Sequence, residues 1–412
     1  MHIKTLIPLL GLWLISAGCR THDASPAAAQ TTTENVLTDS IAGTLATSPA
    51  PSRWLKIEAA PEATPLAANA PVPGTIAPRT GDEIVVAGEF VHTGSPVVLW
   101  LDPGGYDAYR IERRFSPLDE ASWQATQEAG AGFDSPNRYD QRRGPLTPEE
   151  RERVRGGGWD LPTLQRCIDQ IVMHYDVAGT SRQCFKVLHD VRDLSVHFMV
   201  DLDGTIYQTL DVKERARHAG GANDRSIGIE IANIGAYPPD ASGPLDQWYA
   251  RDPDGQVRVT LPDRFGDGGL RTANFTPRPA RAGAVTNEVQ GRLLMQFDFT
   301  TEQYRALSHL VAALCRVLPR IQCDCPRDEH GQVPLQKLPD DALASFHGVL
   351  GHYHLTTNKI DPGPAFQWDT VIGEARRLLA ETNAGRTTPE ASAVHQSRPA
   401  GTPVVTWGCS HR

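Results

Sequence analysis

The 412-residue sequence lacks the defining features of several protein classes. Its formal net charge at pH 7 is -9, with 40 Lys and Arg against 49 Asp and Glu. A protein that holds nucleic acid through phosphates needs positive charge, so we expect no nucleic-acid partner. Beyond the N-terminus no apolar run approaches the roughly 18 residues of a transmembrane helix, which excludes a multi-span membrane protein. The sequence also lacks internal repeats.

Cysteine is scarce, with 7 residues in the chain. Cys323 and Cys325 are one residue apart, but no second pair follows at the spacing of a structural zinc site. Cys19 belongs to the N-terminal signal described below, and without it the number of cysteines is even. An exported protein could pair these cysteines in disulfides, whose connectivity the sequence does not give. We expect Cys323 and Cys325 to bond to different partners or to stay reduced.

The N-terminus has the pattern of an export signal. Residues 1–18 contain an apolar run at 6–15 and end in Ser-Ala-Gly before Cys19. This ending resembles the signal of bacterial lipoproteins, in which the cysteine is the lipidation site, although Ser16 stands where leucine is commonest. Arg20 resembles the residue found in lipoproteins sent to the outer membrane. We therefore expect an exported, lipid-anchored protein facing the periplasm; ordinary cleavage leaving a free cysteine is the alternative.

After the signal, composition divides the chain into further parts. Residues 19–80 are rich in Ala, Pro and Thr and bury too little apolar surface to offset their ordering entropy, so they are expected to form a flexible linker. Residues 81–157 are expected to form a small β-containing extension. It must pack against the main domain, because an isolated pair of strands is not stable in water. The main domain is expected at 158–382, with a Pro-, Gly- and Asp-rich insertion at 238–296 that suits a lid or a wall. Residues 383–412 form a polar tail.

Periodicity predicts an α/β fold with a central, mostly β sheet flanked by helices. The mostly apolar run 226–234 is expected to be a central strand. Thr300 and Gln303 form a capping box that opens a helix, and Ser181 is expected to be the N-cap of another. The remaining expected elements are two strands within 83–101 around a turn at 92–95, a helical piece at 148–154, strands at 170–174, 195–200, 205–210 and 346–350, a hairpin around 252–255 and a helix at 369–379.

Residues 351–368 gather polar side chains that can bind a metal ion. They offer the imidazole of His352, the ammonium of Lys359 and the carboxylate of Asp361. Prolines on both sides of Gly363 stiffen the turn and restrict the carboxylate. A ligand at a strand end, followed by a second on a rigid turn, suits a metal ion. The alternative is a polar loop capped by a Pro-Gly turn.

Two residues on other predicted strands extend this set. His174 ends the strand 170–174, where a single histidine is more often structural. Together with His352 and Asp361, however, it makes two imidazoles and one carboxylate, which leave a fourth tetrahedral position for water as in catalytic zinc sites. Glu230 lies in an otherwise apolar strand, where burying an unpaired carboxylate costs several kcal/mol. It is a candidate base beside the metal; an ion pair with an arginine is the alternative.

The motifs HYDVAG, SVHFMVDLDGTIYQTL, RHAGGANDRSIGIEIAN and GHYHLTTNKIDPGPAF occur in this order within residues 159–382. Together they resemble the zinc-dependent N-acetylmuramoyl-L-alanine amidases of type 2, a family that shares its fold with the peptidoglycan-recognition proteins. The resemblance implies hydrolysis of the amide bond between N-acetylmuramic acid and L-alanine of peptidoglycan or muropeptides, in cell-wall remodelling or recycling. It also implies a Zn²⁺ cofactor.

The resemblance also implies residue roles. His174, His352 and Asp361 match the three zinc ligands of the family, and zinc lowers the pKa of a bound water. Glu230 matches the catalytic acid residue, which takes the water proton and passes it to the departing amine. Lys359 matches the lysine that steadies the negative charge of the tetrahedral intermediate.

Three histidine and asparagine positions complete the expected site. Asp361 is nine positions after His352, where a spacing of ten is common in the intracellular recycling members, so His354 competes for the ligand role. The glycine before His352 favours His352. His218 and Asn223, in RHAGGAN, match positions that line the groove near the peptide and are expected to bind substrate. The alternative for both is a polar loop packed over the sheet.

Three competing functions share these residues. The first is a non-catalytic peptidoglycan-binding module, although such relatives typically lose a metal ligand and none is missing here. The second is a structural lipoprotein that tethers the envelope. The third is a zinc peptidase of other amide specificity, which would keep the same residues. The expected partners are a peptidoglycan or muropeptide substrate and a membrane reached through the lipid anchor.

Overall fold

The structure, a computed structural model, describes residues 72–130 and 132–384. The expected signal peptide, the lipidation site Cys19, most of the expected linker 19–80 and nearly all of the tail 383–412 lie outside the described residues. Within those described, no helix is both long and apolar enough to span a lipid bilayer.

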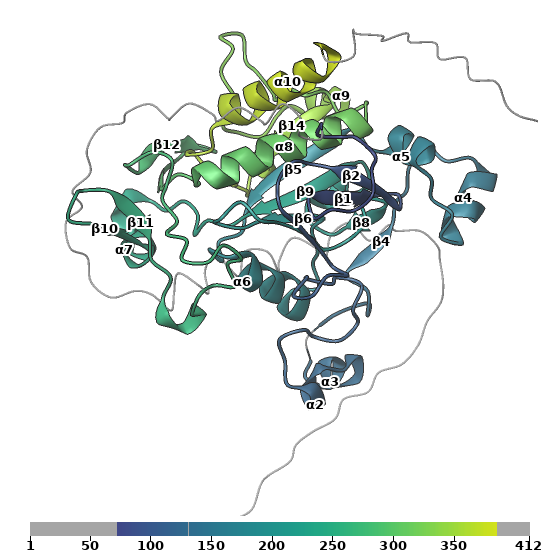
Figure 1. Cartoon of the computed structure of the whole chain (residues 1–412), viewed down its shortest axis with the longest axis horizontal. Coiled ribbons are helices and arrows are strands. Elements are labelled where there is room, and N and C mark those ends of the chain that lie inside the picture. Colours follow the sequence, from purple (N-terminus) through teal and green to yellow (C-terminus); the bar gives the residue numbers. More distant parts are fainter. Residues whose placement is uncertain (1–71, 131, 385–412) are drawn as a thin grey trace, which may run out of the picture. The chain divides into compact units, whose positions relative to one another are not determined.

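A six-stranded sheet lies at the centre of the fold (Figure 1). Its strands, in spatial order, are β14 (Gly348–Gly351), β5 (Gln170–Tyr175), β9 (Ser226–Ile231), β6 (Phe198–Val200), β7 (Ile206–Gln208) and β3 (Val97–Leu99). Neighbouring strands are parallel, except for the antiparallel pair β6 and β7. The expected central position of 226–234 is confirmed, because β9 lies between β5 and β6.

Helices cover both faces of this sheet, so the predicted α/β class is confirmed. The long helices α8 (Thr301–Val317) and α10 (Trp368–Ala384) lie on one face, and α6 (Ser181–Phe185) lies on the other (Figure 1). Ile171 and Ile229 share one apolar core with α8 and α10. Because side chains alternate along a strand, residues at even positions of β5 and β9 face the opposite side.

Two helix starts test the capping expectations. The capping box of α8 is confirmed: Thr300 Oγ1 accepts the Gln303 backbone N–H at 3.0 Å, and Gln303 Oε1 accepts the Thr300 N–H at 2.9 Å. The expected N-cap Ser181 is wrong by one residue. Thr180 caps α6 through its side chain, which accepts the N–H of Gln183, and Ser181 is the first helical residue.

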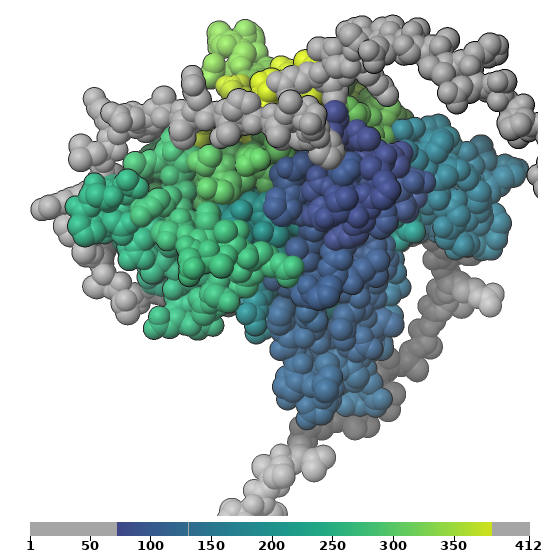
Figure 2. Space-filling model, in the orientation of Figure 1, coloured from purple at the N-terminus to yellow at the C-terminus, as the bar shows by residue number. Residues whose placement is uncertain are grey.

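The expectation of two strands within 83–101 is wrong, because this segment forms three. β1 (Glu83–Val86) and β2 (Glu89–His92) make a hairpin, and β3 leaves it to join the central sheet. The hairpin turn is Ala87-Gly88, in which both residues have positive φ, as a two-residue turn of right-handed twist requires. The hairpin packs on the α8 side of the core, and its purple surface adjoins green surface (Figure 2).

The other elements lie at the margins of the sheet. A second antiparallel ribbon joins β4 (Tyr139–Gln141) to β8 (Glu214–Ala216). The insertion is more regular than its composition suggested, and the hairpin expected around 252–255 is confirmed. The remaining elements are α2 (Leu118–Ala121), α3 (Trp123–Glu128), α4 (Pro148–Arg155), α5 (Leu161–Cys167), α7 (Gly243–Trp248), β10 (Tyr249–Arg251), β11 (Val257–Val259), β12 (Val285–Val289), β13 (Arg292–Gln296) and α9 (Asp340–Ser345).

The cysteines of the described residues are free thiols. They are Cys167, Cys184, Cys315, Cys323 and Cys325. The thiols of Cys315 and Cys323 are within hydrogen-bonding distance of each other. Disulfide pairing of Cys323 and Cys325 with different partners stays a prediction.

Candidate active site

Three side chains that are distant in the sequence converge at one edge of the sheet. His174 lies near the carboxyl end of β5, His352 directly follows β14, and Asp361 lies on the loop beyond. Nδ1 of His174 is 3.0 Å from Nδ1 of His352, and Asp361 Oδ2 is 2.9 and 3.0 Å from these two atoms. The carboxyl ends of neighbouring parallel strands meet at the same edge, which brings the residues together.

The donor set of this cluster fits a divalent cation. One atom from each of His174, His352 and Asp361 lies within 4.8 Å of the others, and all three residues are buried. Burial, and then the neighbouring imidazole, lowers the pKa of His174 to about 4. Burial alone would raise the pKa of Asp361, but the two histidines hold it well below its usual range. Neutral imidazole and ionised carboxylate are the forms that bind a metal, and this N/N/O set suits zinc.

His354 lies outside the cluster, although it is only two residues from His352. Its Nδ1 accepts the backbone N–H of Gly351 at 2.9 Å, and its Nε2 is 2.8 Å from the carbonyl oxygen of Pro334. Both ring nitrogens therefore bond to backbone groups that shape the turn after β14. Of the two candidate histidines, His352 is the one that lies beside His174.

The insertion supports the loop that carries Asp361. At the turn between β12 and β13, Gln290 Nε2 donates to the carbonyl oxygens of Tyr353 and Thr356, both at 2.8 Å. At the end of β13, the Gln296 amide bonds to backbone on both sides of Gly363. A Cβ at Gly363 would lie 2.2 Å from Gln296 Oε1, so the close approach requires glycine. The sequence pattern carried no signal for these two glutamines.

Glu230 lies beside His174 on the same face of the sheet, because the two are paired residues of adjacent parallel strands. Its Oε2 is inaccessible to solvent and has no hydrogen-bond partner. Burial, followed by the charges of Asp361 and Asp176, raises the pKa of Glu230 well above its usual value. The charges of Lys359 and Arg192 oppose this rise, and the alternative of an ion pair with an arginine stays open. A carboxyl oxygen that is inaccessible and without a partner, next to a ligand cluster, is a functional-site feature.

His218 contacts the second nitrogen of His174. Its Nδ1 is 3.1 Å from His174 Nε2, and its own Nε2 is 3.4 Å from Ser226 Oγ. The His218 ring lies over Gly228, where a Cβ would come within 2.6 Å of ring atoms. His218 is therefore placed to orient the imidazole of His174, as outer partners of metal-binding histidines commonly do.

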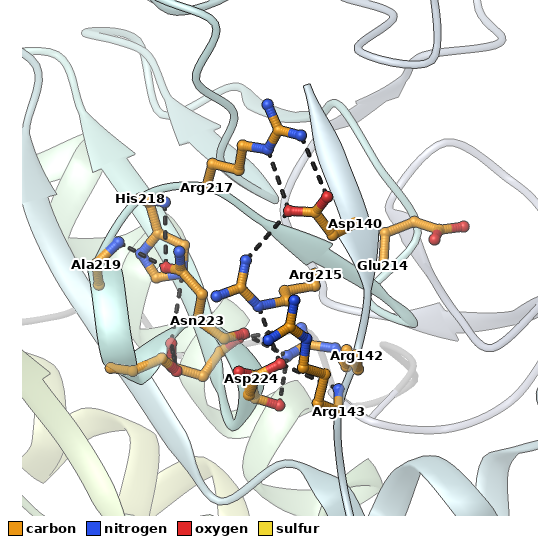
Figure 3. Close-up of polar contacts among 12 residues, drawn as sticks. Asp140, Arg142, Arg143, Glu214, Arg215, Arg217, His218, Ala219, Asn223 and Asp224 are labelled. Carbon is orange, nitrogen blue, oxygen red and sulfur yellow. Dashed lines mark hydrogen bonds and ion pairs between the residues drawn. The ribbon is translucent and has the colours of Figure 1, made fainter. Parts of the chain in front are cut away.

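Asn223 shapes the loop that presents His218. Its Oδ1 accepts the backbone N–H groups of His218 at 3.2 Å and of Ala219 at 2.6 Å (Figure 3). Asn223 is 5% exposed. The nitrogens of His218 and the side-chain oxygen of Asn223 thus bond to groups within the protein. This agrees with the alternative that these residues belong to a polar loop packed over the sheet. Contact of these residues with substrate stays a prediction.

Lys359 lies on the same loop as Asp361 and is partly buried. Its charge is close enough to act on both His174 and Glu230. The structure therefore brings together all five residues predicted to be catalytic or metal-binding. They are His174, Glu230, His352, Lys359 and Asp361.

Comparison with known proteins identifies the family of this region. Residues 164–364 match the profile of a family described as N-acetylmuramoyl-L-alanine amidase. No match was found among curated protein sequences.

Solved structures of amidases are similar to this chain at low sequence identity. A selenomethionine derivative of AmpD has 17% identity over 59% of this chain and 90% of its own, with a TM-score of 0.27. The endolysin amidase LysCS from Clostridium intestinale URNW has 16% identity over 53% and 86%, with a TM-score of 0.26. AmiD from E. coli, complexed with anhydro-N-acetylmuramic acid-L-Ala-D-γ-Glu-L-Lys, has 19% identity over 50% and 57%, with a TM-score of 0.26. On the profile match, residues 164–364 form a domain of the N-acetylmuramoyl-L-alanine amidase family.

Proposed function

We propose that this protein is a zinc-dependent amidase that cleaves the bond between N-acetylmuramic acid and L-alanine in peptidoglycan or its soluble fragments. The observation that carries the proposal is the buried cluster of His174, His352 and Asp361 with the unpaired carboxyl of Glu230 beside it. A family match without this arrangement would suit a binding module equally well. A ligand cluster with no neighbouring base would suit a structural metal site.

The three clustered residues would hold the ion through two imidazole nitrogens and one carboxylate oxygen. A zinc ion in such a site supplies Lewis-acid activation of water and of the amide carbonyl. His218 contacts His174, and Gln290 of the β12–β13 hairpin holds the backbone of the loop before Asp361. These contacts keep the metal-binding side chains in place, so little reorganisation would be needed when the ion binds. The partners of His218 and Gln290 within the protein support this role.

Glu230 would carry the proton in this reaction. Hydrolysis adds the elements of water across the amide, with hydroxyl to the lactyl carbonyl carbon and hydrogen to the nitrogen of L-alanine. The raised pKa of Glu230 means that its carboxylate has a strong tendency to accept the water proton, which it then passes to the leaving nitrogen. Lys359 contributes positive charge where the carbonyl oxygen becomes negative, an effect typically worth ~10²–10³ in rate.

Digestion of purified peptidoglycan tests the proposal. The protein is incubated with and without a chelator, its zinc content is measured, and the products are identified by mass. We expect free stem peptides that begin with L-alanine, and loss of their release on chelation with recovery on zinc addition. Bound zinc without cleavage would support the binding module, and cleavage at a different amide would support another peptidase specificity.

We also propose that the chain is exported and lipid-anchored, in the outer membrane facing the periplasm. The proposal is supported by the Ser-Ala-Gly-Cys sequence that ends at Cys19 and by Arg20 after it. Labelling of cells with radioactive palmitate should mark the wild-type protein but not the Cys19→Ser variant. Label in the variant, or none in the wild type, would contradict the anchor.

A further inference from the structure

A second site is suggested by a cavity outside the amidase match. It has a volume of about 650 Å³ and lies between the β4 strand and α4. This volume is within the range of about 300–1,000 Å³ that is usual for small-molecule sites. Its lining carries four arginines against two carboxylates, in a chain whose formal charge is -9. These charged lining residues are Asp140, Arg142, Arg143, Arg151, Glu152 and Arg155.

Arg142, one of the lining residues, carries a buried positive charge. Arg142 is 2% exposed, and its guanidinium donates to the carbonyl oxygens of Val212, Asn223 and Ser226, each at 3.0 Å. It also donates to the carbonyl oxygen of Asp224 at 3.3 Å and lies 2.9 Å from His197 Nε2. Burial lowers the pKa of Arg142, to about 10, so it keeps its charge at neutral pH. Since these partners are neutral, the charge is not cancelled by a carboxylate contact.

The acidic lining residues, in contrast, are already paired. The Asp140 carboxylate bonds to Arg215 at 3.2 Å and to Arg217 at 3.1 Å, both from the segment around β8 (Figure 3). Glu152 pairs with Arg155 at 2.7 Å on the exposed face of α4. These pairs remove most of the negative charge that could repel an anion from the cavity.

Two arginines of the lining remain available. The side chains of Arg143 and Arg151 are exposed, and neither has an ion pair within the described part of the chain. They come from different elements, since Arg143 follows β4 and Arg151 lies in α4. A planar guanidinium offers paired N–H groups that match the oxygens of a carboxylate or a phosphate.

We propose that this cavity binds an oxyanion, a carboxylate or phosphate group, carried by a ligand of sugar-peptide size. Arg143 and Arg151 make the direct contacts, and the buried charge of Arg142 adds to the attraction of the anion. Residues 140–155 lie outside the region 164–364, so the site belongs to this chain's N-terminal extension and does not depend on the proposed amidase reaction.

The site is also connected to the candidate active site. Arg142 holds the carbonyl oxygen of Asn223, Asn223 holds the backbone of His218, and His218 contacts His174. This chain of contacts joins the lining of the cavity to the loop that presents His218.

Binding to metal-free protein tests the proposal independently of catalysis. Chelator-treated protein is titrated with inorganic pyrophosphate, with a muramyl tripeptide that has free carboxylates, and with phosphatidylglycerol-containing vesicles. We expect at least one probe to bind, with an affinity that falls as salt is added. The double variant Arg143→Gln and Arg151→Gln should weaken that binding at least about tenfold, as expected for the loss of charge-assisted hydrogen bonds. Both side chains are exposed, so the fold should be kept.

The matched control is Arg305→Gln, which removes an exposed arginine from α8. Binding of the tripeptide alone would identify carboxylates of the cell wall as the ligand. Binding of pyrophosphate and vesicles would identify a lipid phosphate, and pyrophosphate alone a free phosphate. Absence of binding by all three probes would overturn the proposal, as would a double variant that binds like the control.

Discussion

The Nδ1 atoms of His174 and His352 lie 3.0 Å apart, although 178 positions separate the two residues in the chain. Asp361 closes the group, with one carboxylate oxygen within 3.0 Å of both nitrogens. The zinc ion of the proposed function would take one atom from each of these three residues.

The ligand assignment predicts which histidine retains zinc. His352→Ala should lose stoichiometric zinc because one of three ligands is removed, whereas His354→Gln should keep it because that side chain bonds to backbone. His174→Ala and Asp361→Ala should behave like His352→Ala. Metal content after gel filtration measures the effect. Full occupancy in His352→Ala would transfer the ligand role to His354.

The position of Glu230 beside the metal cluster predicts that its substitution lowers turnover without removing the metal. Glu230→Gln should keep zinc and lower kcat by ~10²–10⁴, because the amide cannot accept the water proton. Glu288→Gln, an exposed change on β12, is the control and should leave both properties unchanged. Zinc content and stem-peptide release are measured on the same preparation. Unchanged turnover in Glu230→Gln would remove it from the mechanism.

The contact between His218 and His174 predicts an effect on zinc affinity. His218→Ala should weaken zinc binding by about 10–100-fold, the usual effect of losing an outer partner of a ligand. His218→Asn can still place a polar atom near His174 Nε2 and should recover part of the affinity. Competition with a chromogenic chelator gives the dissociation constants. Equal affinity in all three proteins would limit His218 to packing.

Gly228 tests the same contact without removing a polar group. In Gly228→Ala the new Cβ would lie 2.6 Å from the His218 ring, so the ring must move away from its place beside His174. We expect weaker zinc binding, in the same direction as for His218→Ala. Gly221→Ala, in the same loop, meets nothing within 4 Å and serves as control. Identical zinc affinity in the two alanine variants would show that His218 has no positioning role.

Asp201 predicts a pH dependence of stability. Burial raises its pKa from 3.8 to about 7, and its Oδ2 has no hydrogen-bond partner. The folded state therefore holds a proton that the unfolded chain has lost. The resulting stabilisation is complete below about pH 4 and disappears as the pH rises through 7. Asp201→Asn keeps an oxygen for the N–H groups of Ser181 and Leu202.

The neutral amide in the Asp201→Asn variant should thus make the free energy of unfolding less dependent on pH between about 4 and 8. Urea unfolding of wild type and variant at about pH 5 and about pH 8 gives the comparison. The variant should gain stability relative to wild type at the higher pH. The same difference between the two proteins at both pH values would show that Asp201 is not protonated in the folded state.

The sequence predicted the central strands well, because each is a short apolar run bounded by turn residues. It failed at 83–101, where the turn Ala87-Gly88 lacks the asparagine or aspartate that usually announces a two-residue hairpin. It also missed the regularity of the insertion, whose apolar residues, such as Trp248 and Met295, belong to a separate core cluster. Such packing depends on contacts between distant segments, which local periodicity does not contain.

The sequence by itself determined the five residues proposed for the chemistry, because each lies in a short motif whose residue types and order resemble one family. Only the tertiary structure shows that His352, and not His354, lies beside His174, since two neighbouring imidazoles differ in what they face and not in their local pattern. It alone also revealed the contact of His218 with His174 and the arginine-lined cavity. These features arise where separate strands and loops meet, and their distances are set by the packing of the whole sheet.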